Sequence, residues 1–220
     1  MGLRRSDFLH FLIRGVAFCI FRLVYGLEIK GRENLPAEGP AIFLPKHQSW
    51  SDVPIVSLAL WRPASYIAKQ ELFAYPVVRQ FITLLGGVPI DRVKPVRSLD
   101  SFRYVKHLLQ ERDFIVLYPE GTYYPGCMGP GKHRFIKRFL EFQERNGTRE
   151  RKRIPFVPMG IQFAEGCFRN VVKVKIGPPL FARAGEAAAV FTDLIMEQIA
   201  ELSGLPPLKK ERLGPGPKPE

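Results

Sequence analysis

Cysteine is scarce in this sequence, which contains only Cys19, Cys127 and Cys167 among its 220 residues. Their number is odd, they lie far apart, and no two of them have C-x-x-C or zinc-ligand spacing. This usage argues against a disulfide framework and favours a reducing compartment. The four histidines do not suggest a metal site either. We therefore expect neither a metal nor a bound cofactor.

The sequence also lacks an apolar run long enough to span a bilayer. A spanning helix needs about 20 uninterrupted apolar residues, whereas the longest run in the apolar N-terminal stretch covers residues 15–21. On a helix, His10, Arg14 and Arg22 would fall within about a third of the circumference, with Phe and Leu elsewhere. The pattern favours an amphipathic, membrane-associated helix over residues 1–26. A terminal helix packed on the domain or in an oligomer is the alternative.

Acidic residues are outnumbered, since 21 Asp and Glu face 33 Lys and Arg, for a net charge of +12. Such basicity favours anionic partners: nucleic acid, an acidic membrane surface or phosphorylated small molecules. The basic run over residues 145–153 lacks interleaved aromatic residues and any nucleic-acid motif, so we do not expect a nucleic-acid partner. Residues 205–220, rich in Pro, Gly and Lys, are typical of a flexible tail.

Expected strands and helices alternate through residues 27–204, which predicts a single α/β domain. Its central sheet would be largely parallel or mixed and flanked by helices. The expected strands cover residues 27–30, 41–44, 65–68, 86–92, 114–118, 154–161 and 171–177. The two prolines in 154–161 predict an edge or irregular strand. The expected helices cover residues 53–60, 71–85 with a break near Pro76, 98–112, 135–146 and 186–202.

No G-x-S-x-G motif is present, so a serine nucleophile on a strand–helix elbow is not indicated. Instead, His47 and Asp52 follow the expected strand 41–44. On a continuous helix their side chains would lie about 140° apart. They can meet only if His47 lies in the turn before the helix and Asp52 in its first turns. Asp52 could then orient one ring nitrogen and leave the other as a base. The alternative is a surface histidine beside an aspartate that favours the helix dipole.

Polar residues also follow two other expected strands. Arg92 ends the stretch 86–92, and its guanidinium is suited to binding phosphate, although a solvated loop cation is the alternative. A carboxylate, a glycine and a hydroxyl directly follow the strand 114–118, as Glu120, Gly121 and Thr122. Residues of these types at the end of a buried strand favour a ligand-facing loop, with a plain turn as the alternative.

Four segments together resemble the glycerolipid acyltransferase family, of the bacterial lysophosphatidic acid (1-acylglycerol-3-phosphate) acyltransferase type. They are, in order, His47-x-x-x-x-Asp52, residues 87–92, Glu120-Gly121-Thr122 and Val157-Pro158-Met159. The resemblance extends over about residues 27–202. It implies acyl transfer from acyl-CoA or acyl carrier protein to the free hydroxyl of lysophosphatidic acid, giving phosphatidic acid for phospholipid biosynthesis. It also implies association with anionic lipids at the cytoplasmic face of the membrane.

The resemblance implies a role for each matching residue. His47 would be the general base and Asp52 its orienting partner. Arg92 would hold the phosphate of the acceptor. A further loop would shape the acceptor site, through Glu120, Gly121 and Thr122. Pro158 would lie near the acyl-chain and donor pocket.

Two positions depart from the pattern of the family. Lys46 stands before the histidine, where the family often has Asn, and Tyr123 follows Glu-Gly-Thr, where it usually has Arg. Tyr123 leaves open a different lysolipid acceptor, such as an aminoacyl lipid or one with a larger headgroup. A basic, non-enzymatic protein that binds membranes or nucleic acid is a further alternative. Lys46, Lys132 or Arg134 could replace the missing arginine.

Overall fold

The computed structural model describes residues 8, 11, 12, 15, 16, 18, 19, 25–91, 99–146, 153–165 and 170–207. Arg92 lies outside the described residues, and so do most of the predicted N-terminal helix over 1–26 and of the predicted tail over 205–220. The predictions for these three parts of the chain therefore stay predictions.

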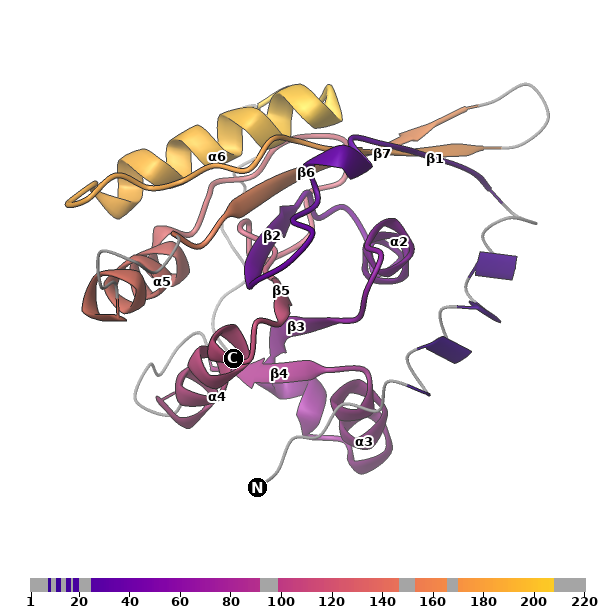
Figure 1. The fold of residues 1–220 in the computed structure, drawn as a ribbon. Coiled ribbons are helices and arrows are strands. Elements are labelled where there is room, and N and C mark those ends of the chain that lie inside the picture. The colour runs from indigo at the N-terminus through magenta and orange to yellow at the C-terminus, as the bar shows by residue number, and fades with distance from the viewer. Residues whose placement is uncertain are drawn as a thin grey trace, which may run out of the picture.

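A mixed sheet of seven strands forms the centre of the described structure (Figure 1). In chain order the strands are β1 (Gly26–Lys30), β2 (Ala41–Pro45), β3 (Ala64–Lys69), β4 (Gly87–Ile90), β5 (Phe114–Val116), β6 (Phe156–Ala164) and β7 (Val171–Ile176). Their spatial order is β1-β7-β6-β2-β5-β3-β4. Every neighbouring pair is parallel except β6 and β7, which are antiparallel. This arrangement confirms the predicted fold class.

Helices cover both faces of the sheet. The α-helices are α2 (Asp52–Ala59), α3 (Pro76–Leu84), α4 (Leu99–Gln110), α5 (His133–Asn146) and α6 (Ala188–Ser203), and the 3₁₀ helices are η1 (Arg32–Asn34) and η2 (Gln70–Phe73). Helices α4, α5 and α6 lie on one side of the sheet, and α2 lies on the other (Figure 1). Successive side chains of a strand alternate between these two layers. Along β2, Ile42 and Leu44 pack in the first layer, and Ala41 and Phe43 in the second.

Two of the expected elements differ from the structure. The segment expected as one helix over 71–85 is divided into η2 and α3, and α3 begins at Pro76, where its missing N–H needs no partner. The prolines do not place β6 at an edge, because β6 lies between β7 and β2. Pro158 is tolerated because it lies opposite Gly177, just past the end of β7, and its carbonyl accepts the Gly177 N–H at 2.9 Å.

Candidate active site

The loops after β2 and β5 leave the same edge of the sheet. The two strands are parallel neighbours with Phe43 opposite Val116, so both chains emerge together at their carboxyl ends. The Leu117 N–H donates to the carbonyl of Phe43 at 2.9 Å, and farther along, the Tyr124 N–H donates to the carbonyl of His47 at 2.9 Å. The sheet thereby brings the His47 segment against the Glu120 segment, although they lie far apart in the sequence.

His47 lies in the turn before α2, and Asp52 is the first residue of that helix. This is the arrangement that their spacing requires if the side chains are to meet. His47 Nδ1 lies 3.1 Å from Asp52 Oδ2. The same oxygen accepts the backbone N–H groups of Gln48 at 2.5 Å and Ser49 at 2.7 Å. Asp52 is fully buried, so these bonds hold its carboxylate in one position.

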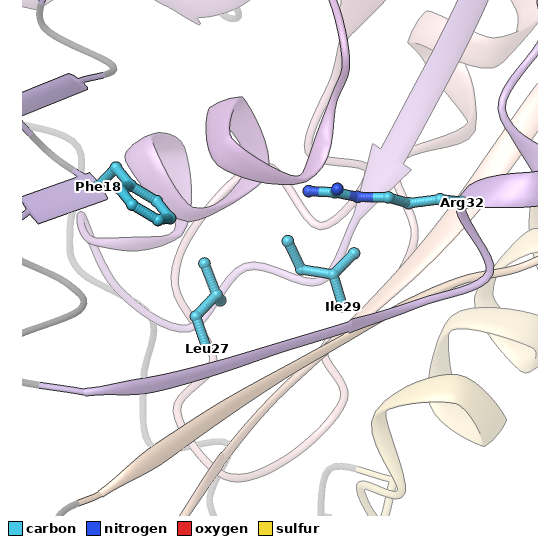
Figure 2. Close-up of a pocket in the computed structure, with 4 residues that line it drawn as sticks. All are labelled: Phe18, Leu27, Ile29 and Arg32. Carbon is cyan, nitrogen blue, oxygen red and sulfur yellow. The ribbon is translucent and has the colours of Figure 1, made fainter.

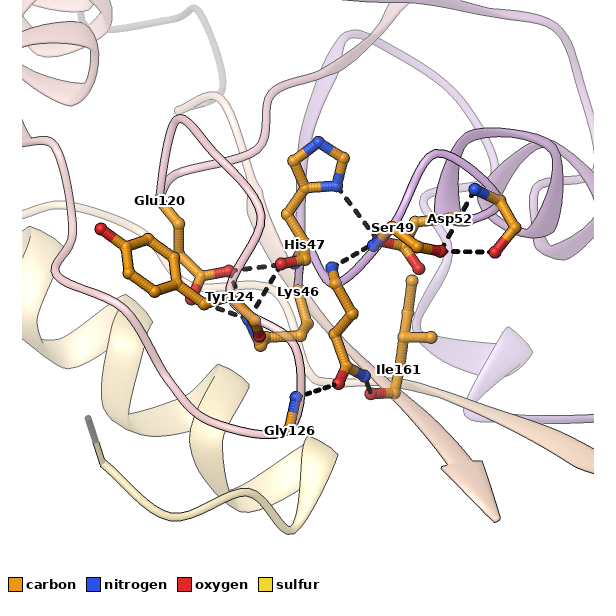
Figure 3. Close-up of polar contacts among 10 residues, drawn as sticks. Lys46, His47, Ser49, Asp52, Glu120, Tyr124, Gly126 and Ile161 are labelled. Carbon is orange, nitrogen blue, oxygen red and sulfur yellow. Dashed lines mark hydrogen bonds and ion pairs between the residues drawn. The ribbon is translucent and has the colours of Figure 1, made fainter. Parts of the chain in front are cut away.

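The contact with Asp52 decides which ring nitrogen of His47 is available. An ionised carboxylate only accepts hydrogen bonds, so the contact requires the proton to be on Nδ1. The other nitrogen, Nε2, points away from Asp52 (Figure 3). The side chain of His47 is 13% exposed, so the imidazole is not sealed inside the protein. This neutral tautomer can accept a proton from a hydroxyl group that approaches Nε2.

Two tyrosine rings enclose the imidazole. The ring of Tyr118 stacks on His47 with centroids 3.7 Å apart, and the ring of Tyr123 meets it edge-on at 4.3 Å. Tyr118 is buried, and its hydroxyl has no hydrogen-bond partner among the described residues. Burial raises the pKa of the Tyr118 phenol well above its ordinary value. Tyr123 is exposed and forms an outer wall of the site.

Lys46 and Glu120 form an ion pair beneath His47, and both side chains are fully buried. The Lys46 ammonium lies 2.8 Å from each carboxylate oxygen of Glu120. It also donates to the carbonyl of His47 at 3.1 Å and to that of Tyr124 at 3.0 Å (Figure 3). Burial lowers the pKa of Lys46, although the Glu120 carboxylate acts in the opposite direction. Because its ammonium is enclosed by these groups, Lys46 does not replace a missing acceptor-binding arginine.

Glu120 binds two backbone groups in addition to Lys46. Its Oε2 accepts the N–H of His47 at 3.0 Å, and its Oε1 accepts the N–H of Gly129 at 2.6 Å. Gln48 makes a second set of links, since it donates to the carbonyl of Ile161 in β6 at 2.8 Å and accepts the N–H of Gly126 at 2.9 Å. Buried polar side chains thus join the segments that follow β2 and β5 to each other and to β6.

The structure also places three other residues that the sequence analysis selected, namely Gly121, Thr122 and Pro158. Gly121 has a φ of +73°, a conformation that favours glycine, and its N–H donates to the carbonyl of Tyr118 at 3.1 Å. Thr122 is exposed on the same loop. Pro158 lies on β6 opposite Leu44, in the strand next to β2. The loop between the strand end and α5 therefore presents Thr122 and Tyr123 outward and Glu120 inward.

Sequence reasoning missed the Lys46–Glu120 pair, the stacking of Tyr118 and the bridging by Gln48. One signal was available for Lys46, because strand alternation puts it on the same face as the buried Ile42 and Leu44. A lysine that continues a buried face needs an acidic partner. Nothing in the sequence indicated that the partner would be Glu120, because the pairing of β2 with β5 depends on the tertiary structure.

A separate hollow lies between the N-terminal residues, β1 and α2. Phe18, Leu27, Ile29 and Arg32 line a volume of about 260 Å³ (Figure 2). An overlapping hollow of about 340 Å³ adds Phe11, Gly15 and Leu58. Among the described lining residues Arg32 carries a charge, and it donates to the carbonyl of Leu58 at 3.2 Å. None of the described residues that line the hollow supplies a nucleophile, an acid or a base, so we assign the candidate active site to the His47 network.

Residues 26–179 match the family model described as Acyltransferase. The match covers most of the chain, and it includes His47, Asp52 and Glu120. The chain therefore belongs to the Acyltransferase family, as the resemblance of its four segments implied.

The names of individual relatives state the acceptor of the acyl group, which the name of the family does not. A chloroplast 1-acyl-sn-glycerol-3-phosphate acyltransferase from Brassica napus is 30% identical over 91% of this chain and 58% of its own length. A lyso-ornithine lipid O-acyltransferase from Brucella abortus is 28% identical over 45% of this chain and 36% of its own length. The chain thus spans less than two thirds of either relative.

A solved structure has the same fold. It is the 1-acyl-sn-glycerophosphate (LPA) acyltransferase PlsC from Thermotoga maritima, with a TM-score of 0.63 and 21% identity. The match covers 88% of this chain and 79% of that one. In the part of the chain that the structure describes, no helix is both long and apolar enough to cross a membrane.

Proposed function

We propose that this protein transfers a fatty acyl group from an acyl thioester to the free hydroxyl of lysophosphatidic acid, giving phosphatidic acid. The observation that carries the proposal is the contact of His47 Nδ1 with the buried Asp52, which leaves Nε2 available as a base. Membership of the Acyltransferase family and the name of the Brassica relative support acyl transfer to this acceptor. The donor would be acyl-CoA or acyl carrier protein.

The reaction needs one proton to be moved twice. Nε2 of His47 takes the proton of the acceptor hydroxyl while the hydroxyl oxygen attacks the thioester carbonyl carbon. The resulting tetrahedral intermediate expels the thiolate, which receives the proton back from the imidazolium, so the products are an ester and a free thiol. Asp52 holds the ring in the reactive tautomer and stabilises the imidazolium that forms. General-base assistance of this kind contributes about 10²–10⁴-fold to a rate.

The substrate-binding roles remain part of the proposal. Arg92 would bind the acceptor phosphate, and the loop with Glu120, Gly121 and Thr122 would shape the acceptor site. Anionic membrane lipids would be the surface on which the enzyme works, at the cytoplasmic face of the membrane. The net charge of +12 supports such a surface, because cationic proteins are attracted to anionic headgroups.

A second candidate acceptor is a lyso-ornithine lipid, which carries an amino-acid headgroup. Two observations favour it: the name of the Brucella relative, and Tyr123 at the position where related enzymes usually have an arginine. The ring of Tyr123 contacts His47, so this residue borders the space where the acceptor hydroxyl must lie. The chemistry at His47 would be the same for both acceptors.

An acceptor panel tests the proposed function. The full chain is incubated with each of three acceptors, which are lysophosphatidic acid, lyso-ornithine lipid and lysophosphatidylcholine. Each acceptor is combined with acyl-CoA and, in a parallel reaction, with acylated acyl carrier protein. Thiol release and the mass of the lipid product are both measured. We expect the highest kcat/KM with lysophosphatidic acid. A higher kcat/KM with lyso-ornithine lipid would select the second candidate, and no thiol release with any acceptor, from acyl-CoA or acyl carrier protein, would contradict acyl transfer itself.

A further inference from the structure

One buried carboxylate links the segment that follows β2 to the loop between β5 and α5. Glu120 accepts hydrogen bonds from Lys46 at the end of β2, from the N–H of His47, and from the N–H of Gly129 in the loop before α5. Both charged side chains are fully buried, and their charged atoms face each other and backbone groups. Both carboxylate oxygens of Glu120 are thus engaged by these donors, at the backbone of His47 and away from its ring (Figure 3).

The ion pair fixes the backbone of His47 on both sides. Glu120 binds the His47 N–H at 3.0 Å, while the Lys46 ammonium binds the His47 carbonyl at 3.1 Å. The Tyr124 N–H reaches the same carbonyl at 2.9 Å, and the Tyr124 carbonyl accepts from Lys46 at 3.0 Å. The position of the imidazole follows from the position of its backbone, so the pair controls how the ring meets Asp52.

We infer that Lys46 and Glu120 are positioning residues, which act as one unit to hold His47 in reach of Asp52 and do not bind the acceptor themselves. The inference rests on the proposed function for its kinetic consequences. It assigns a role to Lys46, a residue that departs from the usual pattern of the family. It also gives Glu120 a different role from direct contact with the acceptor.

The two charges depend on each other. A buried charge whose partner has been removed is strongly unfavourable, whereas removing both charges together leaves no unpaired ion. Either single neutral variant should therefore disturb the His47 segment more than its lost hydrogen bonds alone would. The double variant should recover part of the loss. A residue that bound the acceptor directly would show no such dependence on Lys46.

The test is a double-mutant cycle of Lys46→Met, Glu120→Gln and the double variant, with steady-state kinetics in acceptor and donor. We expect each single variant to lose at least about tenfold in kcat with acceptor KM unchanged within about twofold. With kcat expressed relative to the wild type, the value for the double variant should be about tenfold or more above the product of the values for the two single variants. Lys137→Met, an exposed lysine on α5, is the matched control and should match the wild type. A raised acceptor KM in Glu120→Gln, with additive effects, would overturn the inference.

Hydrogen–deuterium exchange supplies a readout that needs no activity. We expect faster exchange in both peptides 46–52 and 119–129 for the single variants, and no change for Lys137→Met. Unchanged exchange in these peptides of a folded variant would overturn the inference, whether or not the wild type transfers acyl groups. A wild type without activity would contradict the proposed function alone. If neither single variant folds, the double variant decides: faster exchange supports the inference, and wild-type exchange overturns it.

Discussion

At the scale of single residues, the orientation of His47 depends on one oxygen of Asp52. Oδ2 accepts from the His47 ring and from two backbone N–H groups, while Oδ1 is buried without a hydrogen-bond partner among the described residues. The backbone N–H groups of Gln48 and Ser49 thus fix the carboxylate, and the same hydrogen bonds stabilise the turn that carries His47. Asp52 therefore organises the local backbone as well as the imidazole.

Asp52→Asn should reduce kcat by about 10²- to 10⁴-fold, because an amide can donate to Nδ1 and stabilise the wrong tautomer. The acceptor KM should change little, since Asp52 is fully buried and does not reach the acceptor. Steady-state kinetics with lysophosphatidic acid check this, and Asp193→Asn, an exposed aspartate on α6, is the control. Retention of more than about a third of wild-type kcat would mean that Asp52 does not set the tautomer.

Tyr118→Phe should preserve activity and weaken the alkaline loss of stability. The raised pKa of Tyr118 means that the folded protein keeps a proton that the unfolded chain loses above about pH 10. This contribution to the free energy of unfolding is complete below that pH and declines as the pH rises. Urea unfolding at about pH 9 and pH 11 should therefore show a smaller decline in the variant.

The titration of Lys46 is common to both proteins and cancels in that comparison. Equal declines in wild type and variant would contradict the pKa assignment for Tyr118. An absorbance titration of the folded protein at 295 nm offers a second check, because the variant should lose a late-ionising tyrosine. Stacking on His47 needs only the ring, so kcat should stay within about threefold.

The sequence was sufficient to suggest that His47 and Asp52 could meet, with a surface histidine as the alternative, because their spacing and the preceding apolar run are local features. It was not sufficient for the neighbours of the imidazole. The sequence predicted Tyr118 as part of a buried strand. Its stacking on His47 could not be predicted, because the contact depends on the parallel pairing of β2 with β5. The position of Glu120 directly after a strand predicted a side chain that faces a ligand. In the structure its carboxylate instead forms a buried ion pair with Lys46.

At the scale of elements, α6 packs tightly across β6. A Cβ added at Gly160 would lie 2.4 Å from the Leu202 carbonyl carbon and 2.5 Å from the Ser203 nitrogen, which are both backbone atoms. Glycine is required there because neither the helix nor the strand can move aside without disturbing the sheet. The strand adjoining β2 is positioned partly by this contact.

Gly160→Ala should therefore destabilise the protein by about 1–3 kcal/mol, the usual penalty for overpacking. Thermal unfolding monitored by circular dichroism would show a lower Tm. Gly15→Ala is a suitable control, since its added Cβ meets no atom of the described residues within 4 Å. An unchanged Tm for Gly160→Ala would contradict the close packing of α6 on β6.

Element order was predictable because helical and strand patterns alternate in the sequence. The position of β6 between β7 and β2 was not predictable. Proline is confined to edge strands only where a neighbouring strand would need its missing N–H. Pro158 lies where β7 has already ended, so its missing N–H leaves no gap in the ladder. This detail of register between β6 and β7 is a tertiary property and has no local signature.

At the scale of the whole molecule, basic charge is combined with exposed apolar residues near the N-terminus. The net charge is +12, and Phe8 and Phe11 are 80% and 55% exposed. Apolar side chains of this kind can enter the headgroup region, while basic residues are attracted to anionic lipids. The described N-terminal residues lie on the side of the sheet away from α6 (Figure 1).

Phe8→Glu should weaken binding to vesicles that contain phosphatidylglycerol by at least about threefold, because it replaces an inserting ring with an anion. Val190→Glu makes a comparable change at an exposed residue of α6, where Val190 is 60% exposed, and should have a smaller effect. Vesicle co-sedimentation measures both. Equal losses would show that the N-terminal residues are not the membrane contact and that overall charge alone decides binding.

The central claim is that His47 is the base in acyl transfer to a lysolipid. The most direct measurement is phosphatidic acid formation from lysophosphatidic acid and an acyl thioester, by the wild type and by His47→Ala, with His107→Ala as the control for an exposed histidine on α4. We predict a loss of about 10²–10⁴-fold in kcat for His47→Ala and wild-type activity for His107→Ala. A folded His47→Ala variant with wild-type activity would contradict the claim.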